Sequence, residues 1–127
     1  AITIEDYRYE QALKRVDYIK RYIFPGSFIP CVSRLNQAAA KTDLVFMDLF
    51  DIGSSYALTL NAWLKNFNEN LVDIRKLGFD ERFIRMWTYY LCYCAGGFAE
   101  RAISDVQILM CKPLATPEHS LACALSE

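Results

Sequence analysis

Residues 44–56 read LVFMDLFDIGSSY, and this stretch decides the fold class. Residues 44–47 and 49–52 are largely apolar over a length typical of one β-strand. Gly53 and two serines follow, and serine side chains accept hydrogen bonds from the free N–H groups at the start of a helix. The stretch therefore predicts a strand that leads directly into a helix, which indicates an α/β fold and not a helical bundle.

On the N-terminal side, the β-branched residues 2–4 predict a strand end. Apolar residues at spacings of three and four then predict one amphipathic helix over residues 5–23. Pro25 and Gly26 end this helix, because proline lacks an N–H group and glycine permits positive φ. After a loop, Pro30 suits the first turn of a short helix that runs to Ala40.

On the C-terminal side, a helical period begins at Tyr56 and continues to Gly78, the glycine expected just past a helix end. Asp80 is expected to cap a second long helix, which contains the pair Gly96–Gly97. Glycine costs about 1 kcal/mol relative to alanine inside a helix, so the pair predicts close approach by another backbone or by a ligand. Residues 106–110 alternate like a strand, and residues 113–127 are expected to be a disordered tail.

The composition limits the classes of protein to which the chain can belong. The chain has 127 residues, is 54% hydrophobic, and carries 14 basic and 15 acidic side chains. Its apolar content exceeds that of disordered chains, and it lacks the basic excess that nucleic acid binding requires. No apolar run approaches the roughly 18 residues of a membrane span, and no signal peptide is present, so we expect a cytoplasmic protein. The absence of an initiator Met predicts a piece of something longer, with apolar faces and a sheet edge left for the remainder.

The five cysteines do not predict a metal site or a set of disulfides. Cys92 and Cys94 lie two positions apart on a predicted helix, so they point to different faces and cannot share a metal ion. The only histidine, His119, lies in the predicted tail. We expect reduced thiols that pack as small apolar groups.

Three features remain as candidates for chemistry, since no phosphate loop, nucleophile with a partner histidine, or metal cluster is present. The loop from Phe24 to Pro30 could line an apolar channel or merely fold onto the core. Tyr56 follows a strand at a helix start, where its phenol could hydrogen-bond a small anion or simply join the core. The third feature is an aromatic group on the last helix, which could be core or pocket: Trp87, Tyr89, Tyr90, Tyr93 and Phe98.

Ordered motifs across about 110 residues resemble the cyclopropane-fatty-acyl-phospholipid synthases, which depend on S-adenosylmethionine. The matching segments are YIFPG at residues 22–26 with Pro30 and Ser33, DIG at residues 51–53 with Tyr56, TL at residues 59–60 through Trp63, FIRMWTYYL at residues 83–91, CAG at residues 94–96 with Phe98, and residues 105–109.

The resemblance implies a fold and a reaction. The fold would be the C-terminal portion of a Rossmann-like class I methyltransferase sheet. Residues 2–4 would be its fifth strand, residues 44–50 the sixth and residues 106–110 the seventh, with the last two antiparallel. S-adenosylmethionine would donate a methyl group to a cis double bond of a lipid acyl chain, and bicarbonate would then act as the base for ring closure.

The resemblance also implies site residues. Tyr56 would hydrogen-bond the bicarbonate, Ile2 would offer a backbone group to the same anion, and the acyl chain would contact Phe24, Gly26, Phe28, Trp87 and Tyr90. These aromatic residues are predicted to face one elongated apolar cavity. The cofactor-binding motif is expected to lie upstream of Ala1, so no residue of this chain is assigned to it.

The resemblance leaves alternatives open. We expect residues 1–112 to be the C-terminal part of a methyltransferase domain, whose N-terminal half is the first partner. Phospholipid acyl chains at a membrane surface would be the second partner, and a homodimer is a further possibility. A relative that adds a methyl branch or methylates another substrate is one alternative. A truncated, non-catalytic fragment is the other.

Overall fold

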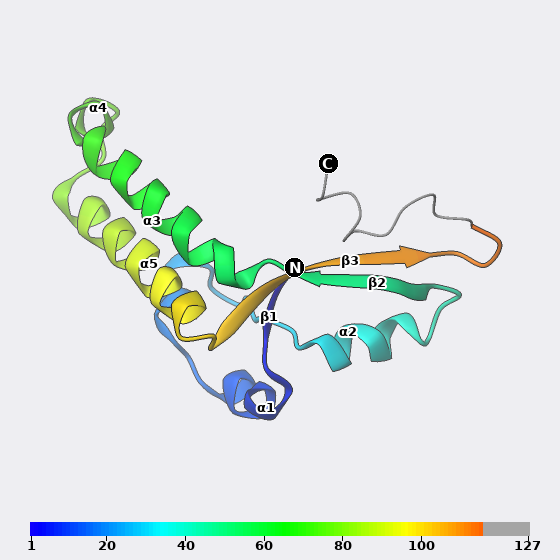
Figure 1. The fold of residues 1–127 in the computed structure, drawn as a ribbon. Coiled ribbons are helices and arrows are strands. Elements are labelled where there is room, and N and C mark those ends of the chain that lie inside the picture. The colour runs from blue at the N-terminus through cyan, green and yellow to red at the C-terminus, as the bar shows by residue number, and fades with distance from the viewer. Residues whose placement is uncertain (116–127) are drawn as a thin grey trace. The chain divides into compact units, whose positions relative to one another are not determined.

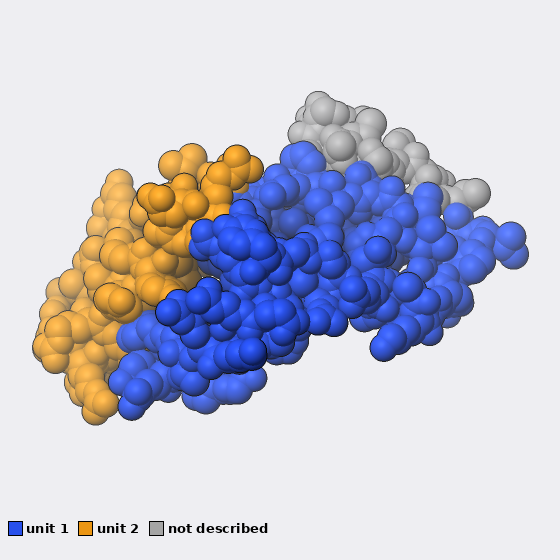
Figure 2. All heavy atoms as spheres, turned by 90° about the horizontal axis from the view of Figure 1, so that it is seen from below, with its two compact units in different colours: residues 1–53, 103–127 blue, residues 54–102 orange. Residues whose placement is uncertain are grey.

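A computed structural model describes residues 1–115, which form two compact units. Of the described residues, unit 1 comprises 1–53 and 103–115, and unit 2 comprises 54–102 (Figure 2). The predicted tail from residue 116 onward, with His119 and Cys123, lies outside the described residues.

Unit 1 contains a three-stranded sheet with β3 (Ile103–Cys111) between β1 (Ile2–Ile4) and β2 (Val45–Asp51) (Figure 1). Both neighbours run antiparallel to β3, so the predicted antiparallel pairing of the last two strands is confirmed. β3 is longer than the predicted strand at 106–110. Its residues 103–105 pair with β1 and its residues 106–111 pair with β2.

The predicted helix over residues 5–23 is wrong, because the chain is interrupted after Lys14. α1 (Asp6–Lys14) ends at Arg15, whose backbone is extended, and a short π-helical segment η1 (Ile19–Ile23) follows. The Asp17 carboxylate accepts a hydrogen bond from the Lys20 N–H at 2.8 Å. This local bond competes with a continuous helix, which explains why the apolar period alone misleads here.

α2 (Val32–Ala39) begins two residues after Pro30, so the prediction that Pro30 occupies the first helical turn is also wrong. The Pro30 carbonyl instead accepts a hydrogen bond from the Ile4 N–H at 2.9 Å, which ties the loop to β1. α2 packs on β2, and Ala39 near its end is buried.

Unit 2 consists of α3 (Gly53–Glu69), whose first residue belongs to unit 1, α4 (Leu71–Lys76) and α5 (Glu81–Ala99). The single helix predicted up to Gly78 is broken at Asn70, whose side-chain amide donates a hydrogen bond to the Asn66 carbonyl at 2.7 Å. Gly78 follows α4 at φ +95°, as predicted for a glycine just past a helix end. The Asp80 carboxylate accepts from the Phe83 N–H at 2.8 Å, so the predicted cap of α5 is confirmed.

Gly96, the first glycine of the pair in α5, does not make the predicted close contact with another backbone. Apart from the neighbouring backbone of α5 itself, no heavy atom of the described residues lies within 4 Å of a Cβ atom built on Gly96. The prediction of close approach by another backbone is therefore wrong at this position. Approach by a ligand at Gly96 stays a prediction.

The buried core of unit 2 lies mainly along α5, which contributes Ile84, Leu91, Cys94, Ala95 and Phe98, and α3 contributes Leu60. Cys94 is buried and Cys92 is exposed, which confirms that the two thiols point to different faces. The described cysteines are free thiols: Cys31, Cys92, Cys94 and Cys111. None of the helices in residues 1–115 is both long and apolar enough to cross a membrane.

Candidate functional site

Tyr56 lies in the first turn of α3, and aromatic rings hold it in place. Its ring centroid is 4.8 Å from that of Phe98 on α5 and 6.0 Å from that of Trp63, which it meets edge-on. Phe98 is buried, whereas Tyr56 retains partial exposure. Within residues 1–115, the Tyr56 hydroxyl makes no hydrogen bond, and no side-chain oxygen is both buried and unsatisfied. The phenol is thus fixed through its ring while its hydroxyl is available to a ligand.

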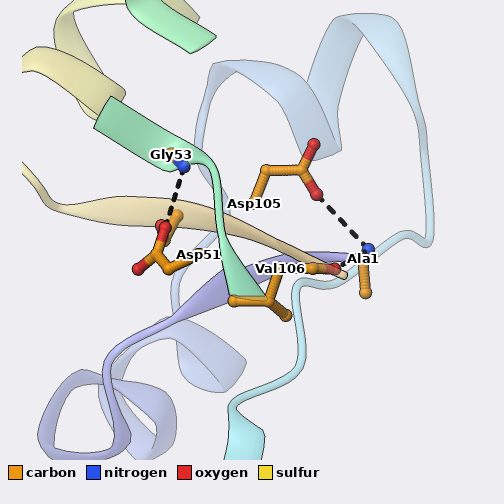
Figure 3. A network of polar contacts seen from close by, with 6 residues as sticks. Ala1, Asp51, Gly53, Asp105 and Val106 are labelled. Atoms are coloured by element: carbon orange, nitrogen blue, oxygen red, sulfur yellow. Dashed lines mark hydrogen bonds and ion pairs between the residues drawn. The ribbon is translucent and has the colours of Figure 1, made fainter. Parts of the chain in front are cut away.

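Polar contacts in unit 1 determine where α3 begins. The Asp51 carboxylate accepts hydrogen bonds from the Gly53 N–H at 2.8 Å and from the Ser104 hydroxyl (Figure 3). A Cβ atom on Gly53 would lie 2.0 Å from Ser104 Oγ and 3.0 Å from Ser104 Cα, so only glycine fits without a shift. The helix starts at Gly53 and not after the two serines, which corrects the predicted serine cap.

Ile2 lies on β1, and its backbone groups point away from β3. Ala1 and Val106 exchange backbone hydrogen bonds of 2.7 and 2.9 Å in both directions. Hydrogen-bonded and non-hydrogen-bonded pairs alternate along an antiparallel ladder, so the next pair, Ile2 with Asp105, is of the non-bonded kind. The Ile4 N–H, two residues on, faces the same outer edge and bonds to Pro30 there. The Ile2 peptide groups therefore lie on the edge of β1 that can receive a further partner.

The loop before α2 exposes its aromatic side chains. Phe24 and Phe28 are 51% and 54% exposed, although Phe28 meets the ring of Tyr9 edge-on at 6.3 Å. Gly26 adopts φ +82° with open space around its Cα, as a turn of this kind requires. Neither phenylalanine is folded into a closed core, which favours the interpretation that they contact a ligand or another part of the protein.

Trp87 and Tyr90 belong to a column of rings along α5. Successive centroids are 4.2 Å apart from Phe79 to Phe83, 5.7 Å from Phe83 to Trp87, and 5.0 Å from Trp87 to Tyr90. Burial raises the pKa of Tyr90, and the adjacent Cys94 thiol and Tyr56 raise it further. Tyr90 is therefore a neutral phenol at physiological pH, which suits an apolar wall.

The candidate residues divide between the two units. Ile2, Phe24, Gly26 and Phe28 belong to unit 1, whereas Tyr56, Trp87 and Tyr90 belong to unit 2. The prediction of one elongated cavity lined by both groups stays a prediction. Sequence reasoning missed the link between Asp51 and Ser104; the only local signal is that an aspartate can bond the backbone N–H two residues on, as Asp51 does to Gly53. In the described part of the chain, no cluster of three or more His, Cys, Asp or Glu residues could hold a metal ion.

The family model of mycolic acid cyclopropane synthetase matches residues 1–108. The chain belongs to this family. It is 34% identical over 99 residues to the tuberculostearic acid methyltransferase UfaA1 of Mycobacterium tuberculosis, an alignment that covers 77% of this chain and 23% of that protein. It is 37% identical over 92 residues to the cyclopropane-fatty-acyl-phospholipid synthase of Escherichia coli, covering 72% of this chain and 24% of the synthase. The chain thus spans about a quarter of the length of these relatives.

Two solved cyclopropane synthases share the fold. The Mycobacterium tuberculosis enzyme MmaA2 superposes with a TM-score of 0.77 at 21% identity, covering 88% of this chain and 42% of that chain. CmaA1, solved with SAH and CTAB, gives a TM-score of 0.72 at 22% identity, covering 87% of this chain and 41% of that chain. The predicted α/β fold class, part of a Rossmann-like methyltransferase sheet, is confirmed.

Proposed function

We propose that this family member supplies the anion-binding phenol and part of the acyl-chain wall of a lipid C-methyltransferase that makes cyclopropane rings. The observation that carries the proposal is Tyr56, whose ring is held by Phe98 and Trp63 while its hydroxyl has no protein partner in the described chain. A phenol used only for packing has no need of a free hydroxyl at a helix start. The similarity to a cyclopropane-fatty-acyl-phospholipid synthase supports the substrate class.

The reaction needs a donor, an alkene and a base. When bound, S-adenosylmethionine supplies a methyl group to one carbon of the cis double bond, and bicarbonate takes a proton from that methyl group as the ring closes. The alkene is a weak nucleophile, so the site must hold it dry and aligned with the donor. This chain's share of that work is to orient the anion and to enclose the lipid.

Two groups of the chain suit a bicarbonate ion. The Tyr56 hydroxyl can donate a hydrogen bond to an anion oxygen, and a hydrogen bond to a charged acceptor is stronger than a neutral one. In unit 1, the Ile2 N–H lies on the outer edge of β1, where it can donate a hydrogen bond to an anion. A base held by such donors keeps its position while it removes the proton.

The acyl chain would contact Phe24, Gly26 and Phe28 from unit 1 and Trp87 and Tyr90 from unit 2. The four aromatic rings among these residues are half-buried or exposed, so their apolar surface is available to contact an acyl chain. Each CH₂ group that leaves water contributes about 0.8 kcal/mol, which makes aromatic walls effective for a long chain. The CTAB in the CmaA1 structure, an alkyl-chain detergent, supports an acyl site on this fold.

A second candidate is transfer after which the cation loses a proton to form a branched alkene, and a hydride donor then reduces this alkene to a methyl branch. The similarity to UfaA1, named a tuberculostearic acid methyltransferase, is close to the similarity to the cyclopropane synthase. Proton NMR of the product lipid separates the two, because cyclopropane ring protons resonate far from those of a methyl branch.

The test is Tyr56→Phe in an enzyme that joins this chain to the rest of the family domain. Loss of one charge-assisted hydrogen bond, about 1.5 to 3 kcal/mol, should lower turnover roughly ten- to hundredfold. The fold should persist because the ring keeps its contacts with Phe98 and Trp63. Tyr89→Phe, which removes the hydroxyl of an exposed tyrosine, is the matched control and should leave turnover unchanged. Full turnover of Tyr56→Phe at saturating bicarbonate would remove Tyr56 from the site.

A further inference from the structure

Residues 71–85, which we call the α4–α5 tip, combine α4, the following turn and the first residues of α5. The tip exposes three large apolar side chains close together in sequence: Val72 at 64%, Leu77 at 76% and Phe79 at 44%. Leu77 falls within the apolar period predicted to run from Tyr56 to Gly78, yet its side chain is among the most exposed apolar side chains of the described residues. A cluster of exposed apolar side chains at a turn indicates a surface that contacts something other than water.

The turn holds these side chains outward. Gly78 adopts φ +95° between Leu77 and Phe79, and no heavy atom of the described residues lies within 4 Å of its Cβ position. The Phe79 ring stacks on that of Phe83 at 4.2 Å, so it is fixed and not loosely hanging. Within unit 2, α4 lies where the C-terminal end of α3 connects to the N-terminal end of α5 (Figure 1). The tip therefore presents exposed apolar side chains, of which Phe79 is held by a ring contact.

The charges of the tip are weighted toward the positive. The tip contains four cationic side chains and three carboxylates. Two carboxylates are neutralised by ion pairs, Arg75 with Glu81 at 2.6 Å and Lys76 with Asp73 at 2.8 Å, and the third, Asp80, caps α5. Arg82 and Arg85 make no ion pair within the described residues. Arg82 and Arg85 thus follow the apolar side chains in sequence without a close ion pair, although the charge of Arg85, after the hydrogen bond from Arg75, also lowers the pKa of Glu81.

We propose that the α4–α5 tip docks on an anionic phospholipid surface, with Leu77 and Phe79 entering the interface and Arg82 and Arg85 facing lipid phosphates. The proposal rests on the proposed function, which requires access to acyl chains in a bilayer. Apolar side chains with flanking cations are the combination that binds the membrane interface without spanning it. A stable protein dimer needs roughly 800 Å² on each partner, and three exposed apolar side chains offer far less.

The experiment measures binding of the 127-residue chain to vesicles of phosphatidylcholine, with and without phosphatidylglycerol. Leu77→Asp should lower the partition coefficient to the anionic vesicles by about tenfold or more, because it places a charge among the exposed apolar side chains. Leu58→Asp is the matched control: Leu58 is 73% exposed, lies in α3 outside the tip, and receives the same charge. Its binding should stay within about twofold of the wild-type chain.

Amide hydrogen exchange then locates the contact. With anionic vesicles, residues 71–85 should become protected, and Arg82→Gln with Arg85→Gln should reduce both the protection and the dependence on phosphatidylglycerol. Equal loss of binding in Leu77→Asp and Leu58→Asp would overturn the proposal, as would unchanged binding in Leu77→Asp. Protection of the tip without vesicles, accompanied by a dimer in sedimentation, would assign the surface to a second copy instead. Vesicle binding is measured without the cofactor, so its outcome is separate from the Tyr56→Phe test of turnover.

Discussion

The two units fix their elements by different forces. In unit 1, hydrogen bonds from Gly53 and Ser104 to the Asp51 carboxylate leave no room for even one added methyl group. In unit 2, ring contacts among Tyr56, Phe98 and Trp63 hold the side chains but leave the Tyr56 hydroxyl without a protein partner. Directional bonds specify a backbone position, whereas ring packing positions a side chain and leaves its polar end for a ligand.

The largest expected loss of stability comes from a change that removes a packed ring from unit 2. Phe98→Ala removes a ring that is only 3% exposed, and such changes cost about 3 to 5 kcal/mol through lost burial and a residual cavity. Denaturant unfolding followed by tryptophan fluorescence measures it, because Trp63 and Trp87 both lie in unit 2. Tyr93→Ala, at a 42% exposed ring on the same helix, should cost less than about 1 kcal/mol. Equal costs for the two variants would contradict the view that the Phe98 ring anchors this unit.

The second-largest expected loss of stability comes from a change that disturbs the polar contacts of unit 1. Gly53→Ala forces a Cβ atom against Ser104, including its backbone Cα at 3.0 Å, and overpacking of this kind costs about 1 to 3 kcal/mol. Amide hydrogen exchange of β3 should report the loss. Combined with Ser104→Ala, which frees the nearest atom, the cost should be smaller than the sum of the single changes. Strict additivity would show that the contact is not the source of the loss.

The sequence predicts most elements of the fold because strong periodic patterns survive tertiary packing. The strand at residues 44–50, the cap at Asp80 and the glycine at 78 follow directly from residue types. The two breaks that it misses, after Lys14 and at Asn70, depend on single side-chain hydrogen bonds by Asp17 and Asn70. Apolar spacing carries no signal for such bonds, because it is the same whether the helix continues or stops.

The candidate site is predictable only in part. The DIG motif at residues 51–53 points to a strand-to-helix turn, and the structure explains the motif through the shared carboxylate of Asp51. The free hydroxyl of Tyr56 depends on what surrounds α3 in space, which no local pattern reports. The exposure of Leu77 was likewise unpredictable, since its spacing matches the buried stripe of α3 and only the break at Asn70 changes its direction.

A smaller effect concerns the start of α5. Asp80→Ala removes the acceptor of the Phe83 N–H bond, and loss of such a cap costs about 1 kcal/mol. The change should lower the midpoint of denaturant unfolding seen by tryptophan fluorescence. Asp43→Ala, at an exposed aspartate outside the helices, is the control and should change stability by less than about 0.5 kcal/mol. If both variants lose the same amount, general charge and not capping accounts for the loss.

The smallest expected effect is a gain in stability, and the variant that produces it also tests for ligand binding beside Gly96. Gly96→Ala places a methyl group where no described atom lies within 4 Å, and alanine favours a helix over glycine by about 0.5 to 1 kcal/mol. The chain should therefore become more stable, in contrast to Gly53→Ala, although both changes add one methyl group. If the space beside Gly96 receives a lipid acyl chain, the same variant should raise the KM for lipid in an enzyme containing the rest of the family domain. Greater stability with an unchanged KM would contradict ligand approach at Gly96 and leave the glycine without a role in binding.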